Sequence, residues 1–218
     1  MKVPKNIGSI EFKAVLPPHL EDELILLINS WFPNKNYNLE VGMTKTTIIF
    51  KEDDEWVYKI PHNGIYIPIS AGFNKESSQM YFSRLKENAC EKERIFYSCL
   101  PSDNIKKYFL KIYKWKRLDG ITLYVQNKVQ ILPEEAMDYG ELPWYLKDKI
   151  KFDISTFWIN RAIEKNGVDS VVDLVDYLNN NLDVTEDLSP SNLGIDKNGN
   201  PVIIDYSGFY SCVDEHKY

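Results

Sequence analysis

A turn signal near the end of the chain limits the possible folds more than any other feature. Asn198 and Gly199 separate two short apolar runs, NLGID and PVIID. Both residue types accept the positive φ of a tight turn, and this pair between apolar runs is the strongest short-range sign of a β-hairpin. The sequence therefore predicts a hairpin here, with the two apolar runs as its antiparallel strands.

Apolar spacing along the rest of the chain predicts both helices and strands. Helical spacing covers residues 18–31, where acidic residues near the start suit the helix dipole, and returns in residues 78–100 and 141–181. Strands are expected at residues 46–50, 56–60, 108–115 and 121–129, with a turn at Asp119 and Gly120 and a connecting loop over residues 61–78. The fold class is therefore expected to be α+β.

Composition excludes several classes of protein. The 218 residues are 44% hydrophobic and 27% charged, as in ordinary globular proteins. A formal net charge of -6 argues against a general nucleic-acid coat or a membrane-surface protein. The longest apolar runs are too short to span a bilayer, so no membrane partner is expected.

The cysteines and the first residues suggest a compartment. Cys90, Cys99 and Cys212 are too few and too unevenly spaced for a disulfide framework or a zinc site. The first residues carry charges and Pro4 where a secretory signal would need an apolar stretch. We therefore expect a cytoplasmic protein.

The residues around the predicted hairpin have the chemistry needed to handle a nucleotide phosphate. Asp187 and Asn192 lie five residues apart in DLSPSN, just before the first strand, and Asp205 begins DYSG after the second. Phosphoryl transfer from ATP requires oxygen ligands for magnesium, a cation on the phosphates, and a group that orients the attacking hydroxyl. Each piece alone is common by chance, since Asp and Asn often form turns or caps.

In this order the two motifs resemble those of the protein-kinase-like superfamily. DLSPSN is similar to its catalytic loop, and DYSG to its aspartate-aromatic-glycine metal motif with one extra residue. The resemblance implies that Asp187 orients or deprotonates an acceptor hydroxyl, while Asn192 and Asp205 hold Mg²⁺. It also implies ATP as the phosphoryl donor and a protein or small molecule as the acceptor.

The same resemblance extends to the strand Val57-Tyr58-Lys59-Ile60. Period-two alternation places Val57 and Lys59 on one face, where the resemblance implies that Lys59 reaches the phosphates and Val57 covers the adenine. The family pairs this lysine with a glutamate on the next helix. Glu93 is favoured because Tyr97 and Leu100 follow four and seven residues later on the same helical face, and Glu91 remains the alternative.

Two further nucleotide contacts follow from the order of the elements alone. The strand over residues 121–129 is expected to lead into a hinge, where Gln126 and Lys128 would lie near the adenine edge. The phosphate loop should lie between the first two strands, but it keeps only Gly42 of the usual glycines. Thr44, Lys45 or Thr46 are the candidates for replacing the missing backbone contacts.

The resemblance implies a two-lobed kinase-like fold with ATP bound between the lobes. Residues 1–36 would form an extension with a helix, residues 37–129 a small antiparallel-sheet lobe, and residues 130–218 a reduced, mostly helical lobe. Only ten residues follow Gly208. The plan is therefore closer to RIO-type or aminoglycoside-phosphotransferase-like kinases than to signalling kinases.

Other functions compete with an active phosphotransferase. The depleted glycine loop also fits a pseudokinase, a catalytically weak or inactive protein that binds nucleotide and acts through a partner. A third interpretation rests on KKYFLKIYKWKR, where basic and aromatic residues alternate as in proteins that bind single-stranded nucleic acid. A half-exposed strand gives the same alternation, so a nucleic-acid partner is not expected.

Overall fold

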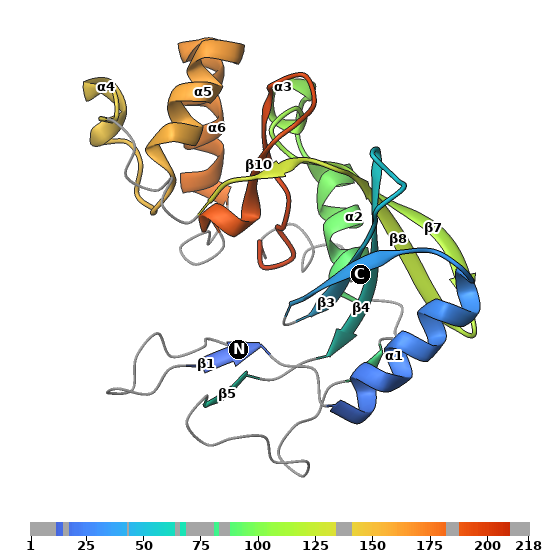
Figure 1. Ribbon diagram of the computed structural model, residues 1–218. Helices are drawn as coiled ribbons and strands as arrows, with labels where there is room; N and C mark the ends of the chain where they lie inside the picture. The colour runs from blue at the N-terminus through green and yellow to red at the C-terminus, as the bar shows by residue number, and fades with distance from the viewer. Residues whose placement is uncertain are drawn as a thin grey trace. The chain divides into compact units, whose positions relative to one another are not determined.

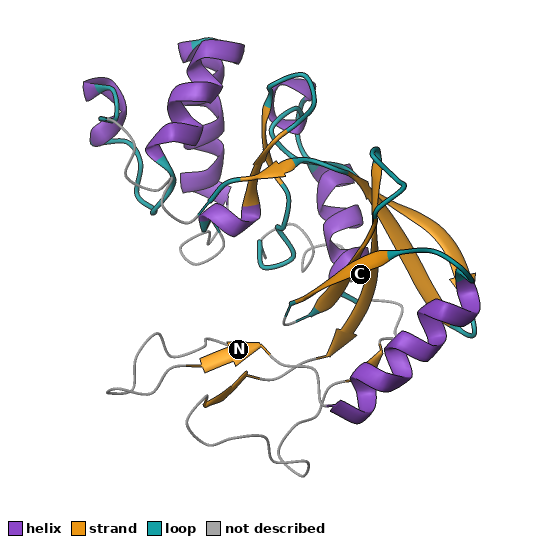
Figure 2. Ribbon diagram, viewed as in Figure 1, coloured by secondary structure: helices purple, strands orange, loops and turns teal. Residues whose placement is uncertain are grey.

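In this computed structural model, the described residues are 12–14, 18–42, 44–63, 66–68, 81–82, 88–133, 141–181 and 188–209. The chain divides into two compact units, residues 1–91 with 113–126 and residues 92–112 with 127–218. Both units contain strands and helices (Figure 2), so the predicted α+β class is confirmed. The sequence predicted a boundary between two lobes after residue 129. The two units instead divide after Gln126, and residues 92–112 also belong to the second unit.

The first unit is built on a six-stranded sheet (Figure 1). Its strand order is β2-β3-β4-β8-β7, and β6 pairs with β4 beside this path. The strands are β2 (Tyr37–Val41), β3 (Lys45–Phe50), β4 (Trp56–Asn63), β6 (Tyr81–Phe82), β7 (Ile112–Leu118) and β8 (Ile121–Asn127). A separate small sheet pairs β1 (Phe12–Ala14) with β5 (Tyr66–Pro68).

Helix α1 (Pro18–Trp31) covers one face of the six-stranded sheet and confirms the helix predicted at these residues. Leu24 and Ile28, one helical turn apart, are completely buried. They pack with Ile48 of β3, Ile60 of β4 and Leu123 of β8. The antiparallel pairing of β3 with β4 confirms the predicted hairpin of residues 46–50 and 56–60.

The second unit combines helices with a three-stranded sheet in the order β11-β10-β9. The strands are β9 (Gln130–Ile131), β10 (Leu193–Ile195) and β11 (Pro201–Ile203). The helices are α3 (Asp103–Lys106), α4 (Trp144–Lys147), α5 (Thr156–Asn166), α6 (Val168–Asn181) and a short 3-10 turn η3 (Pro190–Asn192). Helix α2 (Ala89–Cys99) contributes all but its first three residues, because the division falls after Glu91.

Apolar stripes of α5 and α6 form much of the core of the second unit. Val171, Leu174, Val175 and Leu178 of α6 lie at helical spacing and are fully buried, whereas Val172 and Tyr177 are partly buried against the same core. Trp158 of α5 is also fully buried. The helices expected within residues 141–181 are therefore confirmed, as three separate segments.

The helix predicted from residue 78 to residue 100 is wrong in its first part. Tyr81 and Phe82 form strand β6 and pair with Asn63 and His62 of β4. The helix begins only at Ala89, because the Asn88 side chain accepts a hydrogen bond from the Glu91 amide and caps it. Pairing with β4 thus takes precedence over the apolar spacing of these residues.

Two other local expectations also need correction. The strand expected from residue 108 begins at Ile112, because Tyr108 and Leu110 are hydrogen-bonded to Ile203 of β11 instead. The expected loop over residues 61–78 contains the end of β4 and all of β5.

No helix in the described part of the chain is long and apolar enough to cross a membrane.

The terminal hairpin is confirmed, but its turn differs from the prediction. Strands β10 and β11 pair antiparallel, with Leu193 opposite Ile203. The loop between them runs from Asp196 to Asn200, and only Gly199 in it has a positive φ, of 78°. The Asp196 carboxylate accepts hydrogen bonds from the backbone amides of Asn198 and Asn200, each 2.8 Å long, so this side chain shapes the longer loop.

Candidate functional site

The hairpin brings two predicted metal ligands, Asn192 and Asp205, to the same end. Because Leu193 pairs with Ile203, Asn192 is opposite Ile204, and the Ile204 amide donates to the Asn192 carbonyl at 2.8 Å. Asp205 is the next residue. Their separation by twelve residues in sequence therefore becomes proximity in space, as the sequence predicted.

The segment after β11 is held by hydrogen bonds and by packing. The Asp205 carboxylate accepts from the Ser207 hydroxyl at 3.2 Å and from the Ser207 amide at 3.4 Å. Tyr206 is buried, and its hydroxyl donates to the Leu110 carbonyl at 2.9 Å. Asp205 is half-buried beside these anchored residues, which fix its place at the end of β11.

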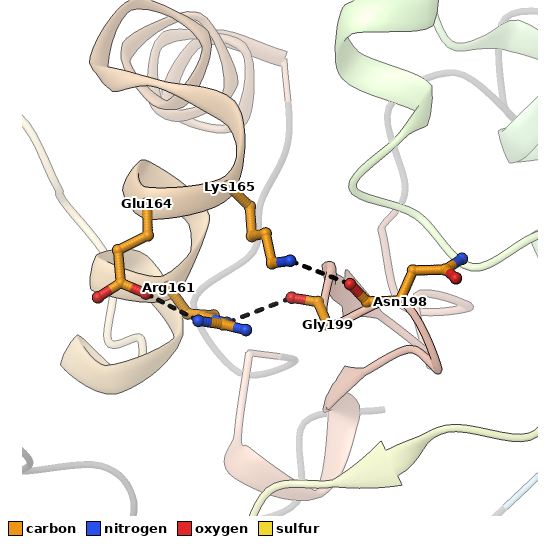
Figure 3. Close-up of polar contacts among 5 residues, drawn as sticks. All are labelled: Arg161, Glu164, Lys165, Asn198 and Gly199. Atoms are coloured by element: carbon orange, nitrogen blue, oxygen red, sulfur yellow. Dashed lines mark hydrogen bonds and ion pairs between the residues drawn. The ribbon is translucent and has the colours of Figure 1, made fainter.

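The opposite end of the hairpin is tied to helix α5 (Figure 3). Arg161 donates from Nε to the Gly199 carbonyl at 3.2 Å, and Lys165 donates from Nζ to the Asn198 carbonyl at 3.0 Å. Arg161 also pairs with Glu164 at 2.9 Å, which orients its guanidinium. The sequence did not predict these contacts, because α5 and the hairpin loop are more than thirty residues apart.

Glu93, favoured in the sequence as the partner of a lysine, is completely buried on α2. Burial raises the pKa of Tyr206 well above its usual range, and the negative charges of Glu93 and Asp205 add to the effect. Phe96, on the same helix, has its ring centroid 5.4 Å from that of Tyr206. Helix α2 therefore packs against the segment that follows β11.

Glu91, the alternative, has a different environment. Its carboxylate accepts a hydrogen bond from the Tyr124 hydroxyl at 2.9 Å, and Asn88 donates to the same hydroxyl at 3.3 Å. Burial raises the pKa of Tyr124, and the Glu91 charge and hydrogen bond act in the same direction. This network ties the start of α2 to β8, so Glu91 has a structural role that the sequence analysis missed.

Strand β4 places Lys59 and Val57 on the face of the sheet opposite α1. Thr47 pairs with Lys59, whereas Ile60, the next residue, packs against α1. Val57, two residues earlier, shares the face of Lys59, as predicted. The Lys59 side chain is only 5% exposed, which is unusual for a lysine.

The connection that should hold the phosphate loop is short. Strands β2 and β3 are separated by three residues, and the Gly42 amide donates to the Lys45 carbonyl at 2.9 Å across the turn. A Cβ at Gly42 would lie 3.1 Å from that carbonyl, so the glycine permits a close approach. Thr46, one proposed substitute, has its hydroxyl 2.9 Å from Nε2 of His62.

The remaining predicted site residues are less informative. Gln126 is buried at the end of β8, and Lys128 is half-buried just beyond it. Asp187, the predicted catalytic residue, lies outside the described residues. Within the described part of the chain, no three His, Cys, Asp or Glu side chains gather in a way that could hold a metal ion.

The second half of the basic and aromatic stretch, from Ile112, lies in β7, the last strand in the order of the sheet. Five consecutive residues, 113–117, are exposed, which exceeds the alternating exposure of a half-buried strand. Its aromatic rings nevertheless have partners, since Trp115 lies edge to face with Tyr58 at 5.1 Å and stacks on Phe32 at 6.0 Å. Lysines are common on edge strands because they oppose strand-to-strand aggregation.

Comparison with known proteins gives no family for this chain. A scan against models of protein families finds no match, and a search of curated proteins finds none. Function must therefore be argued from the residues and their geometry.

Proposed function

We propose that this protein is an ATP- and Mg²⁺-dependent phosphotransferase with a two-lobed, kinase-like fold. The acceptor would be a hydroxyl group of a protein or of a small molecule. One observation carries the proposal: the β10–β11 hairpin holds Asn192 and Asp205 at one end, linked through the 2.8 Å bond between Ile204 and Asn192. The sequence resemblance assigns both residues to the metal.

The chemistry of the two side chains fits magnesium. An amide oxygen and a carboxylate are hard donors, and Mg²⁺ is commonly held by one or two carboxylates together with substrate phosphates. A bound Mg²⁺ would neutralise charge on the phosphates of ATP. Asn192 and Asp205 would hold the ion, and Asp187 would orient the acceptor hydroxyl or take its proton.

Two buried charges support the nucleotide half of the proposal. Lys59 is 5% exposed and Glu93 is completely buried, although burial of a charged group is costly unless an opposite charge compensates it. Proteins therefore keep such groups mainly where they are paired or functional. We assign Lys59 to the phosphates and Glu93 to the support of Lys59, with Val57, Gly42, Gln126 and Lys128 near the nucleotide.

The test is Mg²⁺-dependent release or transfer of labelled γ-phosphate from ATP. We expect turnover by the wild type, and a loss of more than about a hundredfold in Asp205→Asn and in Asp187→Asn. Asp153→Ala, a change of an exposed aspartate in the same unit, serves as the matched control and should keep full activity. Wild-type turnover that persists in Asp205→Asn would refute the assignment of the metal site.

The short β2–β3 connection favours a second candidate, a nucleotide-binding pseudokinase. A connection of three residues with one glycine offers few backbone amides to the phosphates. Such a protein would bind ATP and act through a partner. ATP binding without turnover, measured by calorimetry beside the transfer assay, would select this candidate.

A further inference from the structure

We propose that Lys45 is a second phosphate-binding lysine, which acts beside Lys59 on the same face of the sheet and replaces the missing glycine contacts. The ligand class is a polyphosphate, such as the triphosphate of a nucleotide. This inference deepens the proposed function and rests on it for the identity of the nucleotide. The polyphosphate site itself can be tested separately.

Strand register places the two lysines together. Lys45 pairs with Pro61, and Thr47 pairs with Lys59, so all four residues share one face of the β3–β4 hairpin. Lys45 and Lys59 are diagonal neighbours across the two strands. Diagonal positions lie about 7–8 Å apart, within reach of long side chains such as lysine.

Burial makes the arrangement unusual. Lys45 is 6% exposed and Lys59 is 5% exposed, whereas lysine is among the residues least often buried. Two ammonium groups on one buried face also repel each other. The successive phosphates of a polyanion could contact both lysines at once.

The other candidate substitutes for the glycine loop lie differently. Thr46 pairs with Ile60, which packs against α1, so Thr46 is on the opposite face from Lys59. Its hydroxyl is 2.9 Å from His62 Nε2 within that face. Lys45 alternates with Thr46 and therefore lies on the Lys59 face, next to the turn where the Gly42 amide contacts its carbonyl.

The experiment measures binding of ATP, adenosine and inorganic tripolyphosphate by calorimetry. Four proteins are compared: the wild type, Lys45→Met, Lys45→Arg and Lys51→Met. Methionine keeps the length of the side chain but removes its charge, and arginine keeps the charge. Lys51 is an exposed lysine at the other end of β3, so Lys51→Met is the matched control. Thermal unfolding of each variant shows whether it is folded.

We expect Lys45→Met to weaken ATP and tripolyphosphate binding about tenfold to a hundredfold, with adenosine binding unchanged. Lys45→Arg should recover much of the loss, and Lys51→Met should bind as the wild type does. Equal ATP affinity in a folded Lys45→Met and the wild type would overturn this inference and leave the proposed function intact. Tripolyphosphate binding that needs Lys45, without ATP binding, would support the lysine site and refute the proposed function. A wild type that binds neither ligand would overturn both.

Discussion

Replacing Gly199 with alanine should weaken the link between the hairpin loop and helix α5. Gly199 has a φ of +78°, a conformation that costs a residue with a Cβ about 1–2 kcal/mol. The new Cβ would lie 2.8 Å from Arg161 Nη2, so the guanidinium must move away from the Gly199 carbonyl that it now contacts. Loss of this partly exposed hydrogen bond adds about 1 kcal/mol. The free energy of unfolding should therefore fall by about 2–3 kcal/mol.

A double-mutant cycle separates the two contributions. Urea unfolding, followed by circular dichroism, would be measured for the wild type, Gly199→Ala, Arg161→Ala and the double variant. Without the arginine only the backbone strain and a contact with the flexible end of Lys165 remain, so Gly199→Ala should then cost about 1–2 kcal/mol. The expected coupling is about 1 kcal/mol. An equal cost of Gly199→Ala in both backgrounds would refute the argument that Arg161 clamps the loop.

Three further predictions concern the first unit and helix α2. Tyr124→Phe removes the hydroxyl that donates to the buried Glu91 carboxylate. The free energy of unfolding, measured by urea denaturation, should fall by about 1.5–3 kcal/mol. A loss below about 0.5 kcal/mol would contradict a stabilising role for this hydrogen bond. Glu93→Gln should abolish ATP turnover, whereas Glu91→Gln should keep most of it and lose stability; equal loss of turnover in both variants would speak against Glu93. Burial, with the positive charge of Lys45, lowers the pKa of His62 to about 4. Between pH 6.5 and 4 the unfolded chain therefore binds a proton at His62 that the folded chain does not, and the free energy of unfolding should fall by up to about 3 kcal/mol as the pH is lowered. His62→Gln should reduce this pH dependence in denaturation curves; an unchanged dependence would exclude His62 as its source.

Local patterns were sufficient to predict elements whose sequence signal is short and clear. The helix over residues 18–31 has a clear apolar stripe, and the β3–β4 hairpin joins two β-rich runs through a short acidic turn. The turn at Asp119 and Gly120 was also predictable, because both residues adopt the positive φ that this pair favours. In each case the residues that carry the sequence signal lie within about fifteen residues of each other.

Elements that depend on distant partners were not predictable in the same way. Strand β6 exists because Tyr81 pairs with Asn63, and nothing in its own residues distinguishes it from the helical pattern around it. Spacing favoured Glu93 over Glu91 but gave no sign of the hydrogen bond that Glu91 accepts. That bond comes from Tyr124, on a strand more than thirty residues later.

The terminal hairpin combines both kinds of information. Its strands are three residues long, and a two-stranded hairpin is marginally stable at best in water, so the turn signal alone cannot hold it. Tertiary contacts do so, among them Arg161 on its loop, β9 along the other edge of β10, the backbone hydrogen bonds of Ile203 with Tyr108 and Leu110, and the close fit of Gly194, where a Cβ would lie 2.8 Å from Val129. Ligands of a metal must be held rigidly to bind it well. The sequence therefore identified which residues lie at the mouth of the hairpin, whereas residues elsewhere in the second unit determine how firmly the two proposed ligands, Asn192 and Asp205, are held there.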